Sequence, residues 1–173
     1  MARRKYGWAL RGHPAFVKRF GINGLGEGFS SIASFSLNGI DTVTTYDRNI
    51  HGNIGGDEFL HTLQYIIFPT MNRYDEGPRC VLGLDNSRTH QKDEIYALAA
   101  QFGIKVHFLP TYSYDMNPIE LCFHLAKAHI KKNYHNERII PLITQFTISL
   151  YECCDRKKAA ALFRKCYIPV EDE

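Results

Sequence analysis

The chain has 173 residues, of which 45% are hydrophobic and 23% are charged, as in one soluble globular domain with a substantial core. No run of about 18 apolar residues occurs, which excludes a membrane-spanning helix, and the basic start lacks the apolar core of a secretory signal. Five cysteines without a CxxC pair indicate reduced, intracellular thiols rather than a disulfide framework or a zinc ribbon.

Positive charge is concentrated at the N-terminus, although the net charge is only +3. Residues 1–26 contain six basic residues and no acid, whereas the rest of the chain contains 15 basic and 18 acidic residues. A basic segment of this kind suits a polyanion such as DNA, and it equally suits a solvated tail. Charge alone leaves both interpretations open.

The first predicted elements form a β-hairpin. Residues 29–37 alternate apolar side chains with serines, which predicts a half-buried strand. Asn38–Gly39 predicts a tight turn into a second strand over residues 40–47. A helix follows, which we expect Asp57 to cap and Pro69 to stop.

A βαβ unit is predicted next. Residues 80–85 form a short, nearly continuous apolar run, as expected of a strand buried on both faces. A helix that ends at Gly103 leads to a second strand over residues 104–109, and this order predicts a parallel pair with a right-handed crossover. A helix from Pro118 to about Lys132 and a helical C-terminal segment complete an α/β domain.

Asp85 ends the first strand of this unit, where open α/β sheets gather their functional groups. A carboxylate after an apolar run needs a partner or a metal. The alternative is ordinary turn chemistry that caps the next helix. Asn86 and His90 are candidates to contact this acid rather than the metal itself, although a histidine at a helix start is also ordinary polar surface.

Glu120 lies at the start of the helix that begins at Pro118. Asn117 fits the N-cap, so Glu120 completes a capping box and Asn117 is a candidate to hold the acid in place. The same helix face carries a polar stripe of Glu120, His124, Lys127 and Lys131. Such a stripe suits a track of phosphates, and it equally suits a solvated helix face.

Asp85 and Glu120 are expected to converge, because neighbouring parallel strands lie about 5 Å apart. Mg²⁺ prefers oxygen ligands, usually one or two carboxylates with waters, and paired metal ions activate water in phosphodiester cleavage. Competing signals are weak. The glycine-rich segment 21–28 lacks the flanking strand and helix of a phosphate loop, and neither GxSxG nor HExxH occurs.

Four segments then carry a family resemblance: "RKYGWALRG", "GGDEFLHTL", "LGLDNSRTH" and "LPTYSYDMNPIE". The last two contain Asp85 and Glu120, which 34 residues separate. Over about residues 3–133 the chain resembles the mariner-like transposases of the DDE superfamily. The resemblance implies a ribonuclease-H-like mixed sheet flanked by helices in residues 1–133, with a helical extension over 134–173.

The implied activity is transposase chemistry, in which DNA is cleaved at transposon ends and joined to target DNA with Mg²⁺ or Mn²⁺ as cofactor. Asp85 and Glu120 then match the second and third catalytic, metal-binding acids. The expected partners are transposon-end and target DNA, with a homodimer as a candidate assembly and no membrane. A nuclear location is expected in a eukaryote and a cytoplasmic one otherwise. The residues expected to contact DNA are Arg3, Arg4, Lys5, Trp8, Arg11, Lys127 and Lys131.

The sequence departs from the family pattern in two ways. The family's first acid precedes the Gly-Trp segment, whereas no acid precedes Trp8 here, so the first strand and its Asp are expected to be missing. Thr111 and Tyr114 stand where the family has prolines. The alternative function is therefore a truncated or domesticated remnant that binds nucleic acid without cutting it. A hydrolase of small phosphates is a third interpretation, for which no further substrate motif occurs.

Loss of a central strand would leave exposed sheet edges, so we predict that the chain is less stable than a full domain or pairs with another strand. Thermal unfolding followed by circular dichroism, together with sizing by light scattering, tests this. A monomer that unfolds cooperatively at an ordinary melting temperature would contradict it.

Overall fold

The computed structural model describes residues 28–87, 90–133 and 140–170. The predicted hairpin is confirmed: β1 (Phe29–Ser36) pairs antiparallel with β2 (Gly39–Asp47), with a register shift after Ser34. Gly39 has φ +106, and a Cβ there would lie 2.7 Å from the Cys154 carbonyl oxygen, so the turn requires glycine. The short helix α1 (Arg48–His51) follows.

The next helical segment begins earlier than the sequence predicted. It comprises α2 (Gly56–Thr62), the wider turn η1 (Leu63–Ile67) and the tighter turn η2 (Phe68–Thr70). Asp57 is not its N-cap: Gly55 is, and the Glu58 carboxylate accepts the Gly55 N–H at 2.9 Å. A Cβ on Gly55 would lie 2.8 Å from Glu58 Oε2, so glycine leaves room for this cap, and Asp57 falls in the first turn, where it suits the helix dipole.

The βαβ unit is confirmed, with β3 (Val81–Leu84), α3 (Lys92–Phe102) and β4 (Lys105–Phe108). The strands are parallel, and Gly103 ends the helix with φ +70. The prediction that β3 is buried on both faces is wrong, because Val81 is 51% exposed and a Cβ on Gly83 would meet nothing within 4 Å. In the described ranges β3 has a neighbouring strand on one edge only.

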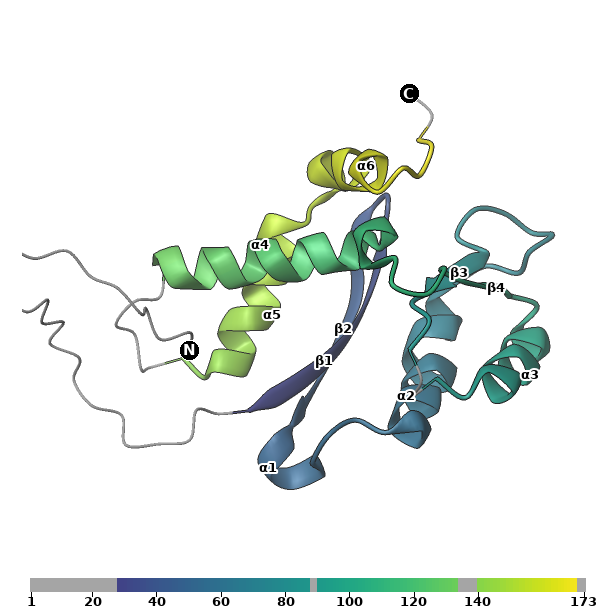
Figure 1. The fold of residues 1–173 in the computed structure, drawn as a ribbon, viewed down its shortest axis with the longest axis horizontal. Coiled ribbons are helices and arrows are strands. Elements are labelled where there is room, and N and C mark those ends of the chain that lie inside the picture. The colour runs from purple at the N-terminus through teal and green to yellow at the C-terminus, as the bar shows by residue number, and fades with distance from the viewer. Residues whose placement is uncertain (1–27, 88–89, 134–139, 171–173) are drawn as a thin grey trace, which may run out of the picture.

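After β4 come the turn η3 (Tyr114–Met116) and three helices: α4 (Pro118–Asn133), α5 (Leu142–Cys153) and α6 (Arg156–Lys165). In Figure 1 the hairpin runs between α4 and α5 on one side and the β3–β4 unit on the other. The predicted helical C-terminal segment is thus confirmed within residues 140–170.

The expected single mixed sheet is not present in the described residues, which form two separate two-stranded sheets. Between them lies a cavity of about 1540 Å³, here called the inter-sheet cavity, whose lining includes residues 31–38 of the hairpin, 81–85 of the β3 segment and parts of the surrounding helices. Side-chain contacts connect the hairpin with the part of the chain that carries the β3–β4 sheet. The Tyr46 and Thr62 hydroxyls lie 2.7 Å apart, and Arg79 Nη1 lies 3.6 Å from Asp41 Oδ1.

Two clusters of buried apolar side chains form the core. The first lies around η1, η2, α3 and β4 and consists of Leu63, Ile67, Phe68, Ile95, Ala99 and Ile104. The second lies between α4, α5 and the hairpin and consists of Cys122, Ala126, Phe146, Leu150 and Cys154. The second cluster contains side chains from both sides of position 133. The predicted division into a domain over residues 1–133 and an extension over 134–173 stays a prediction.

All five cysteines are free thiols, and Cys122, Cys154 and Cys166 are buried. A hydrogen bond with Cys154 raises the pKa of the Cys122 thiol, and burial raises it further. Among the described helices, none is both long and apolar enough to cross a membrane.

Candidate active site

Asp85 lies directly beyond the carboxyl end of β3, and its side chain is 54% exposed. His90 Nε2 lies 2.7 Å from Asp85 Oδ1. An ionised carboxylate only accepts hydrogen bonds, so His90 donates its Nε2–H to Asp85. The structure therefore brings together two residues that the sequence had proposed as an acid and its support.

The His90 ring is fixed by packing as well as by this hydrogen bond. It is 11% exposed and lies against Phe59 of α2, with ring centroids 4.3 Å apart. Its Nδ1 atom is buried and has no hydrogen-bond partner in the part of the chain described. The contact with Phe59 links Asp85 to the first core cluster, because Phe59 packs against that cluster.

Glu120 lies in the first turn of α4, where an acid suits the helix dipole. The backbone sets its position: the Glu120 N–H donates to the Asn117 carbonyl at 3.2 Å, and the Asn117 N–H donates to the Tyr114 carbonyl at 3.2 Å. Glu120 is exposed, and it lines the inter-sheet cavity together with Asp85 and Asn117. The two predicted acids thus face one cavity, from a strand end and from a helix start.

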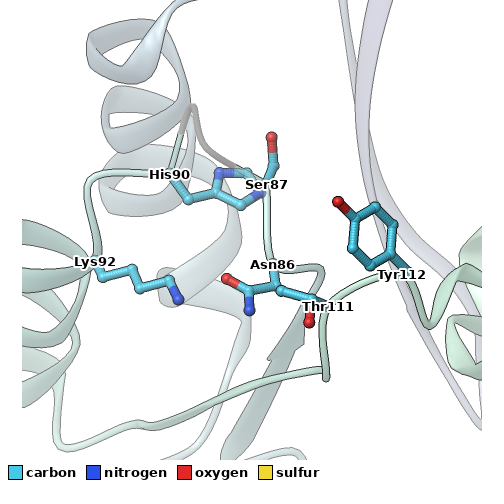
Figure 2. Close-up of a pocket in the computed structure, with 6 residues that line it drawn as sticks. All are labelled: Asn86, Ser87, His90, Lys92, Thr111 and Tyr112. Carbon is cyan, nitrogen blue, oxygen red and sulfur yellow. The ribbon is translucent and has the colours of Figure 1, made fainter.

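A second cavity of about 550 Å³, here called the loop cavity (Figure 2), shares Ser87 and His90 with the inter-sheet cavity. Its lining consists of Asn86, Ser87, His90, Lys92, Thr111 and Tyr112. These residues come from the segment after β3, the start of α3 and the segment after β4. Of the predicted supporting residues, Asn86 therefore faces this cavity, whereas Asn117 lines the inter-sheet cavity.

The predicted DNA-contacting residues fall into two groups. Lys127 and Lys131 are exposed on α4, as are Glu120 and His124 of the same stripe. The other five lie outside the described residues, namely Arg3, Arg4, Lys5, Trp8 and Arg11. The stripe is therefore available to a ligand, and its role stays a prediction.

A metal-binding cluster of three or more His, Cys, Asp or Glu side chains does not occur among residues 28–87, 90–133 and 140–170. Asp85 and Glu120 provide two carboxylates at one cavity, and two carboxylates suit Mg²⁺, which usually keeps several waters. The carboxylate oxygens of this pair are donors that suit a magnesium ion. The mariner-like transposases that the sequence resembles use three acids, and the described part of the chain does not supply the complete set.

Sequence reasoning missed three residues at the site. Phe59 was not among the predicted site residues, although its ring packs against His90. Lys92 and Tyr112 had no assignment, yet both line the loop cavity. The available signal was position, because Tyr112 lies within the segment "LPTYSYDMNPIE" and Lys92 lies two residues after "LGLDNSRTH". The left-handed backbone of Tyr112, with φ 64, could not be read from the sequence.

The structure is that of an α/β protein with small sheets flanked by helices. Its candidate site is acidic, with Asp85 beyond a strand end and Glu120 at a helix start. A family profile described as DDE superfamily endonuclease matches residues 1–140. Because the match covers most of the chain, the chain belongs to the DDE superfamily endonuclease family. Its function is thus of the transposase or nuclease type, and this family suggests DNA as substrate and generally uses divalent metals. Comparisons with curated proteins and with solved structures found no match.

We predict that His90→Ala lowers the free energy of unfolding by about 1–3 kcal/mol, because it removes both the Asp85 hydrogen bond and the Phe59 contact. His107→Ala is the matched control, since His107 is exposed on β4 and its loss should cost no more than about 0.5 kcal/mol. Urea unfolding followed by circular dichroism measures both values. Equal destabilisation by the two changes would contradict the role of His90.

Proposed function

We propose that this chain is the catalytic region of a mariner-like transposase, which cleaves DNA at transposon ends and transfers the freed strand to target DNA. The observation that carries the proposal is the placement of Asp85 and Glu120 at one cavity, because these are the acids that the two motifs select. The exposed stripe of Lys127 and Lys131 on α4 supports DNA as the ligand.

Asp85 and Glu120 would hold a Mg²⁺ or Mn²⁺ ion. When bound, such an ion lowers the pKa of an attacking water or hydroxyl and stabilises the leaving oxygen of the phosphodiester. The chain's own residues orient the acids. His90 fixes the rotamer of Asp85 through its Nε2–H, and the hydrogen bonds around Asn117 fix the helix start that carries Glu120.

A third acid would complete the site on an additional strand between β1 and β3. The support is the inter-sheet cavity, since the unpaired edges of both strands border it within the described residues. Helices cover it as well: Ile67 and Met71 line it from the region of η1 and η2, and Phe123 lines it from α4. A strand placed there would join the two sheets into the mixed, ribonuclease-H-like sheet that the sequence predicts.

The second candidate function is a remnant that binds DNA without cutting it, either alone or as a homodimer. It is favoured because no group of three or more His, Cys, Asp or Glu side chains in the part of the chain described could hold a metal ion. Asp41 also lines the inter-sheet cavity, but its carboxylate lies 3.6 Å from the Arg79 guanidinium. Both candidates share the DNA ligand and the expected nuclear location in a eukaryote, or a cytoplasmic one otherwise. They differ in whether the acidic pair retains a metal ion.

We predict that Asp85→Asn and Glu120→Gln each weaken Mn²⁺ binding about tenfold or more, which corresponds to about 1.4 kcal/mol, because each removes a charged oxygen ligand. Electron paramagnetic resonance of free Mn²⁺ gives the dissociation constants. Asp93→Asn is the control, because Asp93 is exposed in the first turn of α3 and should leave the affinity unchanged. Equal affinity of the original chain and Asp85→Asn would contradict the metal-ligand assignment.

A further inference from the structure

The loop cavity shares Ser87 and His90 with the inter-sheet cavity but has a different chemistry. All six of its lining residues have side chains that can hydrogen-bond, one of them is a lysine, and none is Asp or Glu. It lies between the segments that follow β3 and β4, one of which begins with Asp85, the residue before Asn86. The cavity is therefore positioned for the part of the substrate that flanks the reacting bond.

Lys92 provides an oriented cation in this cavity. Its ammonium group lies 5.0 Å from the centroid of the Phe108 ring, a contact that restricts the long side chain. Lys92 makes no ion pair in the described part of the chain, although Asp93 and Glu94 follow it on α3. In Figure 2 the Lys92 ammonium and the Asn86 amide point toward one another across the cavity. A cation beside an amide donor suits an anionic oxygen such as that of a phosphate.

Tyr112 provides an aromatic surface at the rim. Its side chain is 93% exposed, and its backbone has φ 64, a left-handed conformation that is unfavourable for a bulky residue. Figure 2 shows its hydroxyl turned toward the cavity. Such an exposed ring, held on a strained loop next to a phosphate-type pocket, suits the stacking of a nucleobase.

We propose that the loop cavity binds one unpaired nucleotide of the DNA strand beside the cleaved bond. Lys92 and Asn86 contact its phosphate, and Tyr112 stacks on its base. Tyr112 can stack only on a base whose face is free. Inside a duplex the neighbouring bases cover both faces of each base, so the bound nucleotide is an unpaired one outside the stack. The inference rests on the proposed function, since it places this nucleotide next to the reacting phosphodiester.

The first test is binding of fluorescein-labelled oligonucleotides to the full chain, measured by anisotropy with EDTA present, so that no cleavage is required. A single strand and a duplex with an unpaired overhang should bind more tightly than a blunt duplex of the same sequence. Tyr112→Asn should reduce single-strand affinity about fivefold or more, because it removes the ring while asparagine tolerates the left-handed backbone. Tyr112→Phe should retain the affinity. Tyr151→Asn is the control, as Tyr151 is 48% exposed on α5.

The second test concerns the phosphate contact. Lys92→Ala should weaken single-strand binding and reduce the slope of log K against log salt by about 0.7, the value for one phosphate contact on a single strand. Lys105→Ala is the matched control, because the Lys105 ammonium also lies over a ring, 3.2 Å from the Tyr74 centroid, at the opposite end of β4. The slope for this control should not change.

The proposal would be overturned if Tyr112→Asn bound the single strand as tightly as the original chain, or if this change weakened binding of the overhang duplex and the blunt duplex equally. It would also be overturned if Lys92→Ala left the slope of log K against log salt unchanged. Failure of the proposed function gives a different pattern. In that case Asp85→Asn leaves Mn²⁺ binding intact, while the Tyr112 and Lys92 variants still lose single-strand affinity.

Discussion

The parallel pairing of β3 with β4 holds the two candidate segments at one edge of a sheet. The pairing runs from Val81 opposite Lys105 to Leu84 opposite Phe108, and the Leu109 N–H extends it by donating to the Leu84 carbonyl at 2.7 Å. Because both strands run in the same direction, the segments that follow them begin side by side. Asp85, the loop cavity and the approach to α4 all follow from this arrangement.

Side chains from the helices give this edge its chemistry. Phe59 of α2 positions His90, which in turn donates to Asp85, so the acid is connected to the first core cluster. Glu120 is connected to the second cluster through α4, whose Cys122 and Ala126 are buried there. The candidate site thus lies between two cores, and the inter-sheet cavity separates the sheets that those cores support.

Elements defined by local chemistry could be predicted from the sequence. The Asn38–Gly39 turn and the helix end at Gly103 depend on backbone conformations that few residues adopt, so their positions are readable directly. Features set by distant contacts could not be read in this way. The exposure of Val81 depends on which strand borders β3, and the left-handed backbone of Tyr112 depends on how its loop closes. At the site, the motifs identified Asp85 and Glu120, whereas Lys92 required the structure.

The central claim is that Asp85 and Glu120 face one divalent ion. Its most direct test is paramagnetic broadening of backbone amide resonances during a Mn²⁺ titration of the full chain. The amides of residues 85–87 and of Asn117, Ile119 and Glu120 are expected to broaden first and together, since broadening depends steeply on distance from the ion. Broadening of only one of these segments, or of neither before the rest of the chain, would contradict the claim.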